Sequence, residues 1–284
     1  MISDRFRVSA GAAKKCFALA AFSAALALPA FGEISETLYY DGGHTTFWDT
    51  FHTYNWGHTA TNKDRLYFGN ETIDEFFIGT TPEVDTRFVF AETAGPNGSG
   101  GEVEDKVVEI LNDVTPGEVV IESGDYTFTV MQWGNIHGVD IDDHYADGTI
   151  AGSGSLTVNA GASLMMYIDN SYTGDTVVAG TLSTDVHPDS EDSKYGSGHH
   201  AFGTGALRVE RTGTVNLNGT VQSNSAAEIA GTLNLGENKS VAEAAYNPFA
   251  AATGAVSLVS GGTLDLGGNA NVTMPLAVSG GTIA

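Results

Sequence analysis

A short turn-and-strand unit recurs along the second half of this chain and limits its possible folds more than any other feature. In each copy, a glycine-containing turn is followed by Thr or Ser and then by an aliphatic residue. The glycines are Gly161, Gly180, Gly213, Gly231, Gly262 and Gly281. They lie 19, 33, 18, 31 and 19 residues apart, so three intervals are one coil long and two contain insertions. Repeats of this length, with one to three short strands each, predict an all-β fold, a right-handed parallel β-helix.

Alternation within the repeats indicates which side chains form the core. Successive residues of a strand point to opposite faces, so every second residue can be buried. The expected inward pairs are Leu207 and Val209, Val215 and Leu217, Leu233 and Leu235, Val256 and Leu258, and Leu264 and Leu266. The residues expected to point outward, some in stacked ladders, are Asn216, Asn218, Asn234 and Asp265.

One stretch carries a family resemblance. Gly152-Ser153-Gly154-Ser155-Leu156 is followed by Asn170-Ser171-Tyr172-Thr173-Gly174-Asp175-Thr176 and then by Ala179-Gly180-Thr181-Leu182. This order resembles the autotransporter-associated β-strand repeat, closely over residues 149–184 and loosely over the rest of the C-terminal half. The resemblance implies a β-helical passenger that is displayed at a cell surface, with further repeats and an outer-membrane translocator following it.

The N-terminus has the pattern of a secretory signal peptide. Four basic residues precede or begin an apolar run from Cys16 to Leu28, and Ala30-Phe31-Gly32 provides small residues for cleavage. The run is shorter than the roughly 20 apolar residues of a membrane-spanning helix. We expect residues 1–32 to be removed, which takes away the single cysteine and changes the net charge from −23 to −26. The exported chain would therefore contain no disulfide.

Residues 33–148 differ in composition from the repeats that occupy 149–284. Thirteen of the 27 aromatic residues lie between Tyr39 and Phe90. Because the end rung of a solenoid exposes apolar interior, we expect these aromatics to form an N-terminal cap. A sugar-stacking platform that uses Trp48 or Trp56 is the alternative. Residues 107–114 fit either a helix or a strand, and the strand is favoured since two strand patterns follow at 118–121 and 125–130.

Composition excludes some functions. With 35 acidic and 12 basic residues, the chain has no basic surface for nucleic acid or for an anionic membrane. Abundant glycine and few charged residues (17%) favour short strands closed by tight turns.

Two clusters have residue types that bind metals. The acidic stretch of 140–147 offers oxygen ligands for calcium from Asp140, Asp142, Asp143 and Asp147, with His144 among them. Its spacing is not that of an EF-hand, so a solvated acidic turn is the favoured interpretation, with calcium left open. An insertion within 185–205 contains His187, Asp189, Glu191, Asp192, His199 and His200 without the spacing of a metal site. We assign no metal, cofactor or catalytic residue.

Catalysis is also not expected. The β-helical polysaccharide lyases and glycosidases need carboxylates that converge on a groove, together with a basic residue. Arg208 and Arg211 are the only basic pair of the regular coils, and no paired acids are expected to flank them at rung spacing.

These observations predict an exported structural or adhesive surface protein, adhesin-like, of roughly five to seven coils behind the cap. Its partners would be glycans or proteins of a host or cell surface. A carbohydrate-binding module is the alternative, and a polysaccharide lyase is a weaker one. The sequence stops within a repeat at Ala284, so we expect it to be truncated, with the anchor or translocator missing.

Overall fold

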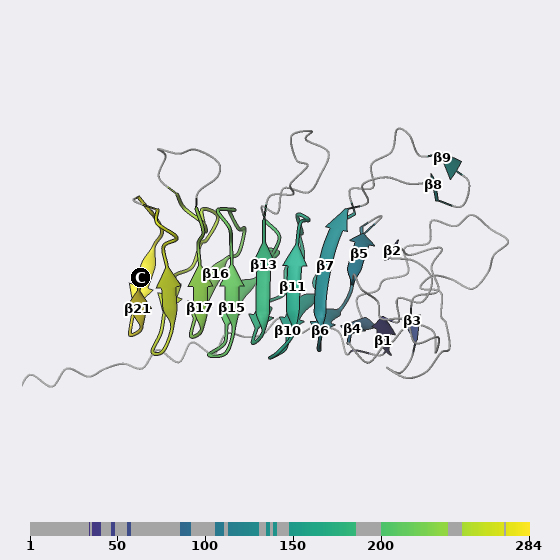
Figure 1. The fold of residues 1–284 in the computed structure, drawn as a ribbon, viewed down its shortest axis with the longest axis horizontal. Coiled ribbons are helices and arrows are strands. Elements are labelled where there is room, and N and C mark those ends of the chain that lie inside the picture. Colours follow the sequence, from purple (N-terminus) through teal and green to yellow (C-terminus); the bar gives the residue numbers. More distant parts are fainter. Residues whose placement is uncertain are drawn as a thin grey trace, which may run out of the picture.

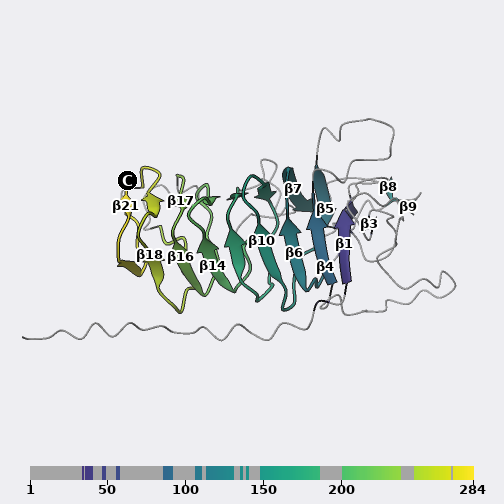
Figure 2. The same cartoon turned by 90° about the horizontal axis from the view of Figure 1, so that it is seen from below.

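Two long parallel sheets form the body of the molecule. The computed structural model describes residues 34, 36–40, 47–48, 56–57, 86–91, 106–110, 113–130, 135–136, 139–140, 148–185, 200–237, 246–269 and 271–284. Figure 1 shows the strands of one sheet side by side along the length of the molecule, and Figure 2 shows the strands of the other. We call these sheets B and A, respectively.

Sheet A contains ten strands, nine of which run parallel. Its strands are β1 (Glu36–Tyr40), β4 (Thr86–Phe90), β6 (Glu118–Ile121), β10 (Ser155–Val158), β12 (Thr176–Val178), β14 (Ala206–Val209), β16 (Ala226–Ile229), β18 (Val256–Leu258) and β20 (Leu276–Val278), with β3 (Trp56–Gly57) antiparallel to β1 at one edge.

Sheet B contains the strands that follow those of sheet A along the chain. They are β2 (Phe47–Trp48), β5 (Val107–Ile110), β7 (Asp125–Val130), β11 (Ser163–Met166), β13 (Thr181–Thr184), β15 (Thr214–Asn216), β17 (Thr232–Asn234), β19 (Thr263–Asp265) and β21 (Thr282–Ile283). A small antiparallel pair, β8 (Asn135–Ile136) and β9 (Val139–Asp140), lies outside both sheets.

The alternation of the two sheets defines a parallel β-helix. Each rung supplies one strand to sheet A and the next strand to sheet B, and nine such rungs lie within the described residues. Six of them come from residues 149–284, and three are built from residues of the N-terminal half. The all-β β-helical fold predicted from the glycine periodicity is thereby confirmed, and so is the strand at Val107–Ile110.

Where the connections are described, a third side closes the coil between sheet B and the next strand of sheet A. Isolated parallel bridges join Val114 to Ile150 and Tyr246 to Val272. Further backbone hydrogen bonds link successive connections, such as that from Gln222 N to Pro248 O at 2.8 Å. Backbone groups on this side are therefore paired between rungs as they are within the sheets.

The interior follows the predicted alternation. All the expected inward aliphatic residues from Leu207 to Leu264 are buried, while Leu266 is only partly buried. On the last described rung, Val278 and Ile283 occupy core positions but are 55% and 50% exposed, because no further described strand stacks on them. Stacking, not the coil alone, is what removes a rung's apolar side chains from water.

An aromatic cluster fills the N-terminal rungs, as the predicted cap requires. The ring centroid of Phe90 lies 5.1 Å from that of Tyr40, 5.4 Å from that of Tyr126 and 5.1 Å from that of Phe128. All four rings are buried, and the hydroxyl of Tyr126 donates to Ala91 O at 3.1 Å. The cluster thus links β1 and β4 of sheet A to β7 of sheet B through side chains.

Glycine is required where the coil turns into sheet A. Gly154, Gly174 and Gly205 stack on successive rungs, and a Cβ added to Gly174 or Gly205 would collide with the carbonyl oxygen of the glycine one rung before. The backbones approach this closely because Gly174 N donates to Gly154 O at 2.9 Å. Most of the repeat's other glycines would meet backbone carbonyl oxygens in the same way, which accounts for the sequence period.

Candidate functional site

The outer face of sheet B carries a row of threonines, one from each of five consecutive rungs. The strand register aligns Thr181 with Thr214, Thr232, Thr263 and Thr282, and Ser163 holds the same position one rung earlier. All these side chains are partly or fully exposed. We call Ser163, Thr181, Thr214, Thr232, Thr263 and Thr282 the hydroxyl row. The repeat that the sequence shows as Gly-Thr therefore becomes a row of hydroxyl-bearing residues across the strands of sheet B, which Figure 1 shows side by side.

A second row runs beside the first, two residues further along each strand. It contains Met165, Ser183, Asn216, Asn234 and Asp265 in register. Asn216 Nδ2 donates to Ser183 Oγ at 2.9 Å, and Asn234 Nδ2 donates to Asn216 Oδ1 at 2.7 Å. We call these residues the amide row. The outward ladder expected for Asn216 and Asn234 is confirmed, while Asn218 instead donates from Nδ2 to Thr184 O at 2.8 Å.

The outer face of sheet A corrects one expectation. Arg208 Nε donates to Asp175 Oδ2 at 3.1 Å, and Glu228 is the register partner of Arg208 on the following rung. The prediction that no acids flank this arginine at rung spacing is therefore wrong. It failed because Asp175 lies one residue before its strand and is brought to β14 across an insertion.

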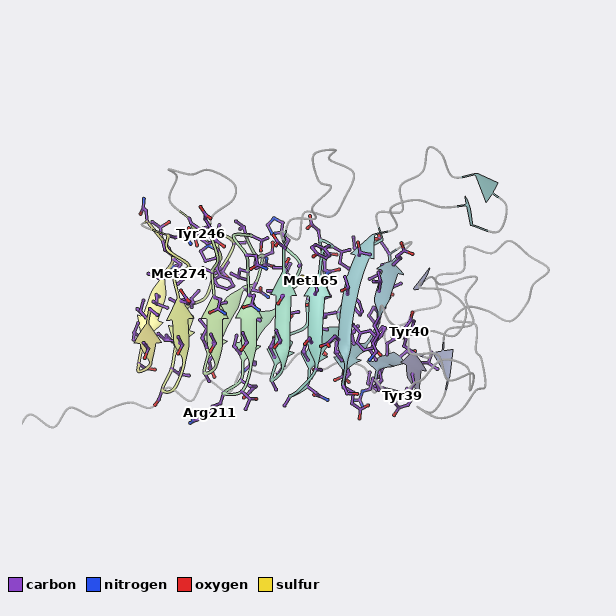
Figure 3. All side chains as sticks on the ribbon, in the orientation of Figure 1. Tyr39, Tyr40, Met165, Arg211, Tyr246 and Met274 are labelled. Carbon is purple, nitrogen blue, oxygen red and sulfur yellow. The ribbon has the colours of Figure 1, made fainter. Side chains whose placement is uncertain are left out.

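This ion pair has the features of a structural contact. Both carboxylate oxygens of Asp175 accept hydrogen bonds, because Ala206 N also donates to its Oδ1 at 3.2 Å. A carboxylate held in this way is not poised to take a proton from a substrate. Arg211, the other basic residue of the regular coils, is exposed at the turn that follows β14 (Figure 3).

Most of the metal-binding candidates lie outside the described residues. Of the stretch 140–147, the structure describes only the backbone of Asp140, in β9. Of the metal-binding candidates in the histidine-containing insertion, it describes only His200, whose Nδ1 lies 2.6 Å from Ser223 Oγ. Among the described residues, no group of three or more His, Cys, Asp or Glu side chains is placed to hold a metal.

The cap aromatics considered for sugar stacking are placed only by their backbone. Trp48 is in β2 and Trp56 is in β3, at the N-terminal ends of the two sheets. Tyr54, Tyr67, Phe68, Phe76 and Phe77 lie outside the described residues. The four clustered rings of the N-terminal rungs are buried and cannot stack on a sugar.

The sequence analysis missed a chain of buried polar side chains on the third side of the coil. Thr176 Oγ1 donates to Phe202 O at 3.0 Å, and Phe202 N donates to Gln222 Oε1 at 3.2 Å. Gln222 Nε2 in turn donates to Thr220 Oγ1 at 2.8 Å. These side chains are fully buried, so their hydrogen bonds join the rungs from inside. Polar residues spaced irregularly around insertions give no periodic signal, which is why the sequence did not reveal them.

The hydroxyls of two buried tyrosines contact the same network, and we expect them to make the stability depend on pH in alkaline solution. The hydroxyl of Tyr172 lies 2.7 Å from Thr176 Oγ1, and that of Tyr246 donates to Thr220 O at 2.6 Å. Burial raises the pKa of both phenols well above their usual value near 10, although the hydrogen bond with Thr176 opposes the shift for Tyr172.

We expect the free energy of unfolding to fall as the pH rises above about 10. The unfolded chain then releases phenolic protons that the folded chain retains, so the contribution is complete below that pH and is lost above it. Tyr172→Phe should make the decline shallower in alkaline urea titrations followed by circular dichroism. Tyr39→Phe, at a partly exposed position, is the control. Equal slopes for wild type and Tyr172→Phe would contradict this origin of the pH dependence.

No membrane span is found among the described residues, since none of their elements is a helix of sufficient length and apolarity. Comparison of this chain with protein-family models, with curated proteins and with solved structures found no match.

Proposed function

We propose that this chain is an exported β-helical rod with a structural or adhesive role at a cell surface. The single observation that carries the proposal is the uninterrupted stack of nine rungs within the described residues, whose sheet B presents mainly serine, threonine and asparagine side chains on its outer face from Ser163 onward. A rod of this kind can extend away from a cell surface and presents the same side-chain types to a partner on successive rungs. Its described carboxylate–arginine contacts are used to hold neighbouring rungs together.

Export is supported by the first 32 residues, which combine basic residues, an apolar run and small residues before the proposed cleavage site. A mature chain without cysteine would rely on backbone ladders and packing, both of which the described rungs supply. The resemblance of residues 149–184 to autotransporter-associated repeats supports a place on the outer membrane or in the medium. The expected partners are glycans or proteins of a host or neighbouring cell.

Location is tested first, in cells that carry the gene. Intact cells are treated with an added protease, then fractionated, and the mass of the recovered chain is measured. We expect a chain that begins at Glu33 and is cleaved on intact cells or found in the medium. A chain that keeps residues 1–32 and is protected from the protease would refute export.

Adhesion is tested with a gene deletion and its complementation. Deletion is expected to reduce attachment to surfaces coated with host-cell glycans or proteins, and the wild-type gene is expected to restore it. A complementing gene that encodes Val215→Asp provides a variant whose rod is broken, since Val215 is fully buried in β15. Equal attachment by all three strains would refute the adhesive role.

A further inference from the structure

Two copies of one tripeptide lie within the described residues, and the fold makes them very different in accessibility. The tripeptide Asn-x-Ser/Thr, with any residue but proline at its centre, is the acceptor for attaching a sugar to the asparagine amide of an exported protein. Asn218-Gly219-Thr220 and Asn271-Val272-Thr273 have this sequence. Three further copies, which begin at Asn70, Asn97 and Asn238, lie outside the described residues.

The copy at Asn271 is held in an extended conformation on the third side of the coil, between β19 and β20. Tyr246 N donates to Asn271 O and Thr273 N donates to Tyr246 O, both at 2.9 Å, and an isolated parallel bridge joins Val272 to Tyr246. Figure 3 labels Tyr246 and the next residue of the copy's strand, Met274, in this part of the rod. The backbone of the tripeptide is thus fixed by the preceding rung.

The two side chains that define the acceptor point away from the core at this copy. Val272 is partly buried and packs against the core, so the residues on either side of it project outward. Asn271 and Thr273 are both exposed, and neither side chain makes a hydrogen bond to another described residue. The amide nitrogen and the hydroxyl two residues further on are therefore presented together on one surface.

The copy at Asn218 has the same sequence but is occupied by contacts of the rod itself. Asn218 has a left-handed φ of 49°, and its Nδ2 donates to Thr184 O at 2.8 Å. Thr220 is fully buried, and its Oγ1 donates to Leu217 O at 2.7 Å. The nitrogen that a sugar would join and the hydroxyl that a transferase would recognise are both in use between and within rungs. The sequence makes the two copies equal, and the fold separates them.

We infer that Asn271 is a glycosylation site, to which a transferase of the producing cell adds a sugar from a diphosphate-activated donor. Asn271 Nδ2 forms a bond to the anomeric carbon of the sugar and gives one proton to a basic group of the transferase. The bond between that carbon and the phosphate oxygen of the donor breaks, and the nucleoside or lipid diphosphate leaves with the bonding electrons. No group is oxidised or reduced.

This inference rests on the export proposed above, because the tripeptide is an acceptor in exported proteins. It adds to that proposal a specific covalent modification and its position. A sugar at Asn271 stands on the third side of the coil, so the outer faces of sheets A and B stay uncovered.

The test is mass spectrometry of the full chain recovered from cells that carry the gene, with electron-transfer fragmentation of its peptides to locate any sugar. Asn271→Gln removes the acceptor nitrogen. Thr273→Val keeps the β-branched shape and removes the hydroxyl, while Thr273→Ser keeps the hydroxyl and is the matched control. Since Asn271 and Thr273 are exposed, all three variants should fold, and circular dichroism checks that they do.

We expect the peptide that contains Asn271 to be heavier by the mass of one or more sugar residues in the wild type and in Thr273→Ser. The same peptide should be unmodified in Thr273→Val and Asn271→Gln, and Asn218 should be unmodified in every chain. An exported wild-type chain whose Asn271 carries no sugar would overturn the inference and leave the proposed function standing, whereas a chain neither exported nor modified would overturn both. Modification of Asn218 to the same extent as Asn271, or of Asn271 in Thr273→Val, would also overturn the inference.

Discussion

Replacing Phe90 by alanine is expected to lower the free energy of unfolding by about 3–5 kcal/mol, the range found for buried phenylalanine. Phe90 is fully buried in β4, with the rings of Tyr40, Tyr126 and Phe128 around it. Its removal leaves a cavity among rings from the rungs before and after its own, which the backbone ladders prevent from collapsing. Urea titration followed by circular dichroism and by tyrosine fluorescence measures the change.

Two milder variants show whether packing is the cause. Phe90→Leu keeps most of the buried volume and should cost clearly less than the alanine variant. Tyr126→Phe removes only the hydroxyl that donates to Ala91 O, and we expect a loss of about 1 kcal/mol. If all three variants had similar midpoints, the aromatic cluster would not be what stabilises the N-terminal rungs.

The second large effect is expected from a single added methyl group, in Gly205→Ala. The new Cβ would overlap the carbonyl carbon and oxygen of Gly174 on the preceding rung, so the two backbones must separate. Separation weakens the hydrogen bonds on both sides of the turn, including that from Ser225 N to Gly205 O at 3.1 Å. We expect a loss of about 3 kcal/mol, at the upper end of the range for overpacking.

Ser225→Ala is the matched control for this prediction. Ser225 lies on the next rung of the same turn and already carries a Cβ, so alanine adds no atom there. Its free energy of unfolding should stay within about 0.5 kcal/mol of the wild type, as for most surface substitutions. A Gly205→Ala protein as stable as Ser225→Ala would show that the turn can widen freely, and that the glycine period has another cause.

Much of the fold could be predicted from local pattern. The glycine period reports the close approach of successive backbones at the turns, and strict alternation in segments such as Leu207-Arg208-Val209 reports a strand with one buried face. Both signals are local consequences of stacking, so a single sequence contains them. The strand at Val107–Ile110 has a weaker signal in the sequence, because a four-residue segment with Val and Ile fits both the helical and the strand period.

The features that escaped prediction depend on which rungs become neighbours. Asp175 and Arg208 are 33 residues apart, with the predicted insertion between them, and meet because β12 and β14 are paired in sheet A. Ala201 and Phe202 were assigned to that insertion, yet both are fully buried and belong to the third side of the coil. Likewise, the alignment of the threonines into a row needs the register, which glycine spacing alone does not give.

The ladder of rungs also determines how the length of the rod relates to its stability. Each described rung between the first and the last bonds to the one before it and the one after it, so its free energy depends mainly on those two neighbours. Inserting or deleting a whole rung would change the length by about 4.8 Å while leaving the other interfaces as they were. Length is therefore a property that this architecture can vary in small equal steps, independently of the shape of its cross-section.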